Sequence, residues 1–419
     1  MSDFKINSIA TKQGQHGPVI AGVSTINSTG CMKIPSGPTA FRTNDPLGRG
    51  RAVFGGGYGS SSPYPELNIL DMVNITTTGN AVDYGDLSVA RSANGAGGNA
   101  TRGIFAAGRF PGSNNDTNII DFVTFSSGGG ANDFGDLNNL PNTIGGFSDS
   151  TRAIFSGGYD ARNSPYLGTR VQTFATIAST GDSSDFGDRV SPGRAETTFS
   201  NATRGFQMGN STQGASSVNQ DEIEMTIIQT KGSTVNFGEL DGQGSAAHAL
   251  IGNLSSYGGT ASQTRGIIFS GKTSPNASRN IIEFLTLTTF GNSQNFGDQL
   301  TSSTSGAVTS TGNQIKAVVK TSSAHNGNVL EQVTIATTGN STDFGDLAFS
   351  TNNGKLNAMS GLPSATRVVM PGGDTFDSGS VNTIQYVEIS TTGNSIDFGT
   401  LATRGTAGVS GFSNGHGGL

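Results

Sequence analysis

A seven-residue motif, Gly-x-x-x-Asp/Asn-Phe/Tyr-Gly, occurs seven times in this chain at intervals of about fifty residues. Its copies span residues 79–85, 129–135, 181–187, 232–238, 291–297, 339–345 and 393–399. Self-similarity at such a period is typical of tandem supersecondary units that stack to bury a shared core. The repeat constrains the fold more strongly than the length of 419 residues, which alone would suggest two or three domains.

Each repeat carries the signals of four short β-strands. In the second copy, residues 101–108 and 118–125 are rich in β-branched and aromatic residues, which predicts two strands. Residues 132–137 predict a third strand, and residues 143–147 a weaker fourth that leads into the next copy. Four short strands in about fifty residues match the size of one blade of a β-propeller.

The strand that precedes each motif has apolar residues on both of its faces. In the first copy, Val73 and Ile75 have one parity along the strand, whereas Leu70 and Met72 have the other. Residues of opposite parity point to opposite faces of a strand. We therefore expect both faces to be buried, as they are when each blade packs between two neighbours.

The motif itself has the residues of a hairpin turn followed by a packing contact. The opening glycine supplies the positive φ that tight turns need, and the Asp or Asn before the aromatic residue is expected to hydrogen-bond local backbone. We expect the aromatic side chain to pack between blades and the closing glycine to admit a neighbouring backbone or ring. These pairs are Tyr84 and Gly85, Phe134 and Gly135, Phe186 and Gly187, Phe237 and Gly238, Phe296 and Gly297, Phe344 and Gly345, and Phe398 and Gly399.

The two ends of the repeat array predict a closed ring. The array begins at Arg51 without a strand of the preceding type, and residues 401–419 resemble the segment that follows each motif. The C-terminal segment would therefore complete the first blade and remove the free sheet edges. The expected fold is all-β, a seven-bladed propeller of four-stranded blades over residues 46–419, with a trimeric fibre or a β-helix as the alternative. Residues 1–45 are too few for a core of their own and predict an extended arm that docks onto another protein.

A cation recurs at the start of one strand in every repeat, and it has two interpretations. Seven cations around a ring could line an anion-binding channel, or each could bind a blade carboxylate or carbonyl through its fork of donors. We prefer the second interpretation, because a residue present in every repeat is usually needed by the repeat. The residues are Arg51, Arg102, Arg152, Arg204, Arg265 and Arg367, with Lys316 in the sixth copy.

The chain carries no recognisable catalytic, cofactor or metal motif. His16, His248, His325 and His416 are scattered, and the single cysteine, Cys31, lies outside the predicted propeller. The acids that follow most motif copies lack the alternating oxygen ligands of calcium loops. We expect no cofactor, no metal and no enzymatic activity. The net charge of −6 opposes nucleic-acid binding, and no apolar run of 18 residues predicts membrane insertion.

Two resemblances add to these residues. The glycine doublets 55–56, 157–158 and 372–373 resemble those of kelch repeats, although the kelch Tyr and Trp are absent. Over residues 51–419, the repeats Arg-Gly-Ile-Phe-x-Gly-Gly, Asn-x-Ile-Asp-Phe-Val-Thr-Ile and Thr-Thr-Gly-Asn-x-x-Asp-Phe-Gly-Asp-Leu resemble virion proteins of tailed phages of marine bacteria and cyanobacteria. That resemblance implies a structural component of the tail, baseplate or fibres, and it supplies no catalytic residues.

Together these observations predict a non-catalytic virion structural protein. Its partners would be other virion proteins, bound through residues 1–45, and a protein or glycan of the host surface bound by the propeller. A soluble propeller adhesin or interaction module outside a virion is one alternative, and a polysaccharide-degrading enzyme is another. The longest interval between motifs, residues 240–265, would enlarge one loop and is the candidate for a specialised surface.

Overall fold

The structure, a computed structural model, describes most of the chain from Gly50 to Gly415 and three short strands before it. The described residues are 19–20, 24–26, 32–33, 50–59, 65–111, 116–159, 168–193, 197–208, 221–240, 258–269, 272–273, 277–303, 309–320, 328–348, 360–375, 379–402, 406–407 and 409–415. No described residue is helical. Most of the predicted arm, residues 1–45, and most of the interval 240–265 therefore lie outside the described residues.

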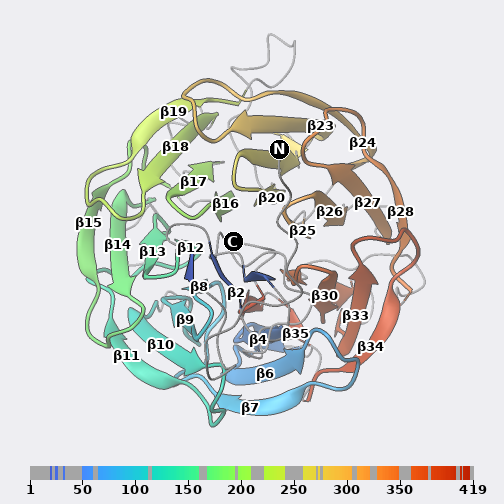
Figure 1. The fold of residues 1–419 in the computed structure, drawn as a ribbon. Helices are drawn as coiled ribbons and strands as arrows, with labels where there is room; N and C mark the ends of the chain where they lie inside the picture. Colours follow the sequence, from blue (N-terminus) through green and yellow to red (C-terminus); the bar gives the residue numbers. More distant parts are fainter. Residues whose placement is uncertain are drawn as a thin grey trace.

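Seven antiparallel four-stranded sheets surround a central axis as the blades of a propeller (Figure 1), which confirms the predicted fold. From the axis outward, we call the four positions the inner, second, third and outer strands. Blade 1 is β36 (Ser410–Ser413), β4 (Arg51–Gly55), β6 (Ile69–Asn74) and β7 (Val82–Asp86). Blade 2 is β8 (Gly95–Gly98), β9 (Arg102–Ala106), β10 (Ile119–Thr124) and β11 (Asn132–Asp136). Blade 3 is β12 (Gly145–Ser148), β13 (Arg152–Ser156), β14 (Val171–Thr176) and β15 (Ser184–Asp188).

The remaining blades follow in chain order around the ring. Blade 4 is β16 (Thr197–Ser200), β17 (Arg204–Met208), β18 (Glu222–Ile227) and β19 (Val235–Glu239). Blade 5 is β20 (Gly258–Ala261), β21 (Arg265–Phe269), β23 (Ala277–Thr286) and β24 (Gln294–Ser303). Blade 6 is β25 (Thr309–Gly312), β26 (Lys316–Lys320), β27 (Val329–Thr334) and β28 (Thr342–Asp346). Blade 7 is β29 (Leu362–Pro363), β30 (Arg367–Pro371), β33 (Thr383–Glu388) and β34 (Ile396–Thr400).

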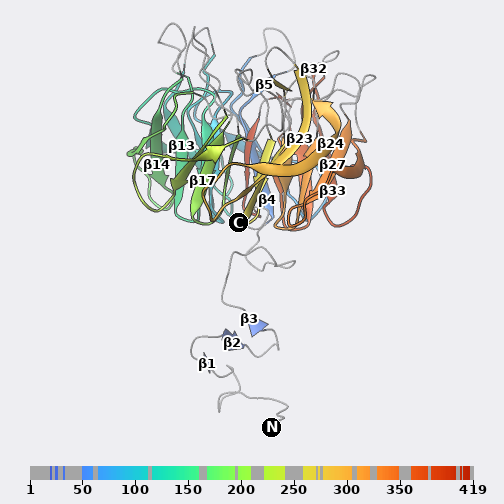
Figure 2. The ribbon, with the colours of Figure 1, turned by 90° about the horizontal axis from the view of Figure 1, so that it is seen from above.

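Short strands add to this frame. β5 (Tyr58–Gly59) pairs with β35 (Thr406–Ala407), β22 (Lys272–Thr273) pairs with β23, and β31 (Asp374–Thr375) pairs with β32 (Gly379–Ser380). β1 (Val19–Ile20), β2 (Ser24–Ile26) and β3 (Met32–Lys33) form a separate antiparallel sheet that Figure 2 shows outside the ring.

The C-terminal strand closes the ring, as the sequence predicted. β36 pairs with β4 from Ser410 opposite Gly55 to Ser413 opposite Ala52. The next residue, Asn414, accepts hydrogen bonds through Oδ1 from the amides of Gly50 and Arg51, at 2.7 and 2.8 Å. In blade 2, Asn99 Oδ1 accepts from Thr101 N and Arg102 N within a continuous turn. The two chain ends thus meet where the other blades have a short turn, and Asn414 makes the hydrogen bonds of that turn.

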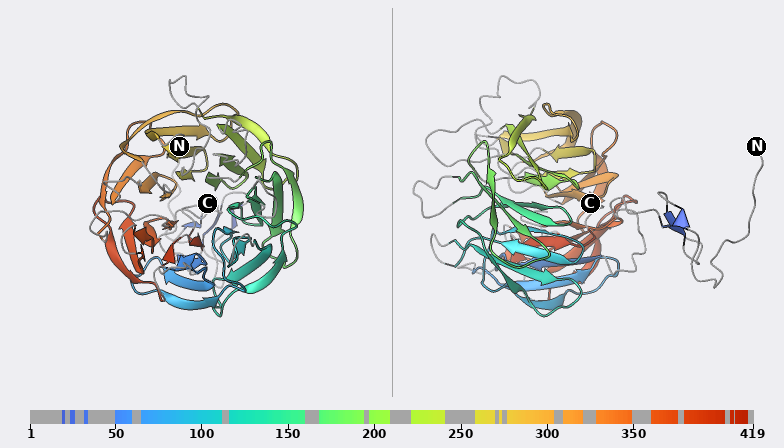
Figure 3. Two further views of the ribbon diagram at one scale, coloured as in Figure 1. Left: turned by 180° about the vertical axis from the view of Figure 1, so that it is seen from behind. Right: turned by 60° about the vertical axis from the view of Figure 1, so that its left-hand side comes forward.

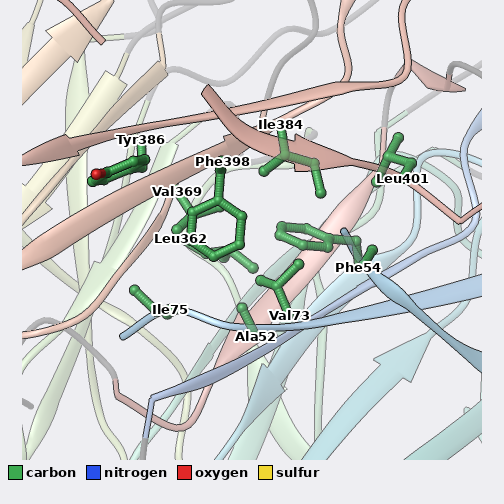
Figure 4. Close-up of a cluster of buried hydrophobic side chains, with 11 residues drawn as sticks. Ala52, Phe54, Val73, Ile75, Leu362, Val369, Ile384, Tyr386, Phe398 and Leu401 are labelled. Carbon is green, nitrogen blue, oxygen red and sulfur yellow. The ribbon is translucent and has the colours of Figure 1, made fainter. Parts of the chain in front are cut away.

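The hydrophobic core is divided among the seven seams between neighbouring blades. Figure 4 shows the seam between blades 7 and 1, where Phe398 of the outer strand packs with Ala52, Phe54 and Val73 of blade 1. Six similar clusters fill the other seams. The third strands are buried on both faces, as expected: in β6, Leu70 and Val73 are buried and Met72 is half-buried. Each blade is therefore stabilised by apolar contact with two neighbours rather than by a core of its own.

Side-chain sizes match across the seams near the axis. Phe147 of β12 lies against Gly205 of blade 4, where an added Cβ would overlap the phenyl ring. The equivalent inner residue of blade 2 is Gly97, and it faces the Cβ of Ala153 in blade 3. A large inner side chain is thus paired with a small residue on the next blade, which keeps the seam close-packed.

The motif forms a β-bulge at the outer strand of every blade. In blade 2, Ile120 lies opposite Gly135 and Asp121 opposite Asp133, so Phe134 has no partner in the ladder. The same irregularity recurs in the other six blades. A bulge re-aims the side chain of its extra residue. Phe134 is consequently 3% exposed inside the cluster between blades 2 and 3, whereas Asp133 beside it is exposed.

The closing glycine of each motif touches the hairpin of the next blade. A Cβ on Gly135 would lie 2.5 Å from the carbonyl carbon of Gly181, and Gly181 N donates to Phe134 O at 2.6 Å. The last motif returns to the first in the same way, because Gly399 meets Gly79, whose amide donates to Phe398 O at 2.8 Å. The repeated motif therefore forms a backbone contact that runs around the entire outer rim.

The second copy departs from the spacing of the others. Sequence alignment places Gly129 at the opening position, but Gly130 is the residue that contacts Gly85 and donates to Tyr84 O at 2.6 Å. Tyr84 is the single tyrosine among the motif aromatics. Its hydroxyl donates to Thr124 O at 2.5 Å and accepts from Gly128 N at 3.1 Å. The hydroxyl therefore lies against the β10–β11 hairpin of blade 2, whose contact residue is shifted by one position.

The ring has two unlike faces. The turns between inner and second strands and the hairpins between third and outer strands lie on one side, which we call the turn face. The connections between second and third strands and between blades lie on the opposite side, the loop face, where Figure 2 shows β5 and β32. Gly50 and Gly415, the two described ends of the ring, lie at the turn face, and Figure 3 shows β1–β3 on that side of the ring.

We expect Gly135→Ala to destabilise the protein more than Gly181→Ala. Both glycines have positive φ, at 139° and 148°, so an alanine is strained at either position by about 1–3 kcal/mol. Only at Gly135 would the Cβ also strike the next blade, because nothing lies within 4 Å of a Cβ on Gly181. Denaturant unfolding should give Gly135→Ala an additional loss of roughly 1–3 kcal/mol. Equal losses would mean that the closing glycine is required only for its backbone conformation.

Tyr84→Phe should cost about 1–2 kcal/mol of unfolding free energy, since it removes two hydrogen bonds from a buried hydroxyl. The matched change Phe134→Tyr should also destabilise, because it adds a hydroxyl to a buried aromatic in a seam formed by apolar residues. Thermal unfolding of the two variants checks both expectations. A stable Phe134→Tyr variant would show that any hairpin accepts the hydroxyl.

Candidate functional site

A central channel is the cavity best defined by the described residues. It has a volume of about 270 Å³ and runs between the inner strands of all seven blades. Its wall consists of Gly, Ala, Ser, Thr, Phe, Leu and Pro residues, without a charged side chain. Small residues bring the inner strands close to the axis, and this explains why residues 143–147, which lead into the inner strand β12, gave only a weak strand signal.

Several channel hydroxyls are used in joining the blades. Ser148 Oγ donates to Gly98 O at 2.7 Å and accepts from Gly98 N at 3.0 Å, which ties blade 3 to blade 2. Thr198 Oγ1 and Ser200 Oγ donate to carbonyls of blade 3, each at 3.0 Å. The wall is consequently neutral, and it combines a few hydroxyls with apolar side chains such as Phe147, Phe199 and Leu362.

The repeated cations do not line this channel. Each arginine instead reaches across a seam to the carbonyl of the residue that follows the third strand of the next blade. Arg102 donates to Ile177 O at 2.9 Å and Arg152 to Ile228 O at 3.1 Å. The other bonds join Arg51 to Phe125 O, Arg204 to Leu287 O, Arg265 to Ile335 O and Arg367 to Ile75 O. This geometry favours the structural interpretation of the cations over an anion channel.

An aromatic ring of the third strand holds four of these guanidinium groups in place. Arg102 lies 4.6 Å from the ring centroid of Phe122, and Arg265 lies 4.4 Å from that of Phe284. Arg152 and Arg367 lie similarly over Phe174 and Tyr386. Stacking on an aromatic face restricts the planar guanidinium and aims its donors at the neighbouring blade.

The sequence reading missed a set of buried acids on the third strands. Asp121, in the middle of the apolar strand β10, is 0% exposed and accepts from Ser88 N at 3.0 Å. Glu224 accepts from Val190 N at 3.0 Å, and Glu331 accepts from Leu300 N at 2.9 Å. Ser88 and Val190 belong to the segments that leave the outer strands of the preceding blades, whereas Leu300 lies within the outer strand β24 of blade 5. The position of an acid within an otherwise apolar strand was the signal in the sequence that could have predicted these buried acids.

Two of these acids form ion pairs that are fully buried. Arg91 Nη2 lies 2.8 Å from Asp121 Oδ2, and Arg189 Nη2 lies 3.2 Å from Glu224 Oε1. Burial lowers the pKa of both arginines, whereas the adjacent carboxylates oppose that shift. Each pair joins the connection that follows one blade to the third strand of the next, so both pairs tie neighbouring blades together.

The described residues contain no cluster of side chains suited to binding a metal ion. No group of three or more His, Cys, Asp or Glu residues within them could hold a metal ion. The four histidines and Cys31 lie outside the described residues. Within the described ranges, no helix is long and apolar enough to cross a membrane.

Lys320, at the loop-face end of β26, should make stability depend on pH. It is 3% exposed, and burial lowers its pKa from 10.5 to about 7. Between these two pH values the unfolded chain binds the proton that the folded chain has lost, so stability should rise from pH 7 toward pH 10. We expect Lys320→Met to flatten this rise and to increase the melting temperature at neutral pH. An unchanged pH profile in that variant would contradict the assignment.

Comparisons with known proteins support the fold and give no family for this chain. No family model matches the chain, and no curated protein matches it. Among solved structures, the structure of YjhT superposes with a TM-score of 0.52 over 72% of this chain and 96% of that protein, at 9% sequence identity. At this identity the likeness concerns architecture alone. The chain is a seven-bladed β-propeller that resembles YjhT, a kelch-repeat protein.

Proposed function

We propose that this protein is a non-catalytic structural component of a phage virion. In this proposal, residues 1–45 anchor it to other virion proteins, and the propeller is displayed to bind a protein or a glycan of the host surface. The virion assignment rests on the repeat signature of residues 51–419, which resembles that of virion proteins of tailed phages. Tail, baseplate and fibre are its candidate locations.

The observation that carries the proposal is the placement of the chain ends relative to the loops. Gly50 follows the arm and lies at the turn face, next to the inner strand β36. An anchor attached there would cover the short, regular turns. It would leave the loop face, whose connections vary in length from blade to blade, pointing away from the particle. Variable loops on a fixed scaffold are the usual place for recognition.

The chemistry of the described residues supports binding rather than catalysis. The channel wall is uncharged, and the buried ion pairs are occupied in joining blades. A soluble adhesin with the same propeller remains the second candidate, since the loop face would serve it equally well.

Mass spectrometry of purified particles, combined with cross-linking, tests the anchoring. We expect peptides of the full chain in the particle and cross-links from residues 1–45, including Lys5, Lys12 and Lys33, to another virion protein. A variant lacking residues 1–45 should fold but fail to enter particles. Normal incorporation of that variant would contradict the role of the arm.

A host-cell binding assay distinguishes a propeller that binds the host surface from one that only decorates the particle. Purified protein should bind intact host cells, and a variant in which residues 241–257 are replaced by a short glycine linker tests whether the longest interval between motifs contributes to that binding. A matched substitution in the turn Asp149–Thr151 on the turn face should leave binding unchanged. Release of soluble sugar from host polysaccharide would instead favour the enzyme alternative.

A further inference from the structure

We propose that the propeller opens locally at the seam between blades 6 and 7, and not at the joint between its chain ends. The seven copies of the repeat allow each seam to be compared with six others built on the same plan. The seam between blades 6 and 7 departs from that plan in the cation that should cross it. It also borders blade 7, whose inner strand is the shortest of the seven.

The crossing cation is missing from this seam. Six seams have a guanidinium that donates to the carbonyl after the third strand of the next blade. In blade 6 the cation is Lys316, and its Nζ donates at 3.0 Å to Gln332 Oε1 of its own blade. No described side chain donates to the equivalent carbonyl, that of Ile389. A hydrogen bond from a charged donor typically contributes about 1.5–3 kcal/mol, so this seam lacks a contact of that size.

The third-strand residue that contacts the cation explains why Lys316 does not reach across the seam to blade 7. The equivalent position holds an aromatic ring in blades 2, 3, 5 and 7 and a methionine in blades 1 and 4. In blade 6 it is Gln332, whose amide oxygen binds the ammonium group. An ammonium is a compact charge without the fork that lets arginine serve two directions. The Lys and Gln together keep the charge within blade 6.

The inner strand of blade 7 is also short. The inner strands of the other six blades have four residues, whereas β29 consists of Leu362 and Pro363 alone. It pairs with β30 at two positions, and Pro363 has no amide hydrogen to donate. Blade 7 is therefore held less firmly on the side of the axis.

The joint between the chain ends lies within blade 1 and has a four-residue inner strand, and the 7–1 seam beside it keeps its crossing arginine. β36 makes four pairs with β4, and Asn414 restores the turn hydrogen bonds. Arg367 crosses from blade 7 to blade 1 and donates to Ile75 O at 3.2 Å and to Thr76 O at 2.8 Å. The covalent break in the ring is thus reinforced, and the weaker seam lies one blade away from it.

Hydrogen exchange of the full chain tests whether the 6–7 seam opens more often than the other seams. The amides of Gly393 and Ser395 donate across the 6–7 seam, and those of Gly339 and Ser341 donate across the 5–6 seam. The amide of Gly79 donates across the 7–1 seam, next to the blade that holds both chain ends. Because the backbone bonds are alike, exchange reports how often each seam opens. We expect exchange at Gly393 and Ser395 to be about tenfold or more faster than at Gly339 and Ser341, which corresponds to about 1.4 kcal/mol.

Two variants change the seams in opposite directions. Lys316→Arg with Gln332→Phe recreates the crossing arginine on an aromatic ring, and it should slow exchange at Gly393 by about tenfold. The matched change Arg265→Lys removes the crossing at Ile335, and it should accelerate exchange at Gly339 while leaving Gly393 unchanged. Both predictions are read within a folded protein, so a global loss of stability would be visible as faster exchange in every blade.

The proposal is overturned if Gly393 exchanges no faster than Gly339 in the unmodified protein, or if Gly79 exchanges fastest. It is also overturned if the double variant folds but leaves exchange at Gly393 unchanged. Should the double variant not fold, the comparison among the seven seams of the unmodified protein still decides between the two locations.

Discussion

The contact between each outer strand and the hairpin of the next blade is the interaction on which this ring depends. At every seam a bulge turns one aromatic side chain toward the neighbour, and a glycine removes the Cβ that would keep the two backbones apart. Two backbone hydrogen bonds then form, such as Gly181 N to Phe134 O and Ser183 N to Asp136 O. The last blade makes the same contact with the first, so every outer strand is hydrogen-bonded to the hairpin of a neighbouring blade.

This construction separates what holds the protein together from what can vary. The repeated arginines, the buried acids of the third strands and the motif aromatics bind neighbouring blades, and the channel wall carries no charged side chain. Changes in these positions would affect stability before they affected binding. The parts of the loop connections that lie outside these contacts can change in length and chemistry at low cost to the fold.

The repeat in the sequence was sufficient to predict the number of blades, the closing strand and the burial of both faces of the third strands. These features follow from local periodicity. The contacts that cross seams could not be read in the same way, since they join residues about fifty positions apart whose register depends on the bulge. The target of Arg102, the shift from Gly129 to Gly130 and the donors to Asp121 all belong to this class.

The position of the chain ends has a consequence for how such a domain can be built into larger proteins. Asn414 gives the break in blade 1 the hydrogen bonds of an ordinary turn, so the ring has no structurally unique start. Turns of the same kind at Asn99, Asn201 and Asn313 are equivalent places to cut the chain once the present ends are joined. The propeller is in effect a circular sequence, and a host protein could carry it as an insertion whose two connections leave side by side.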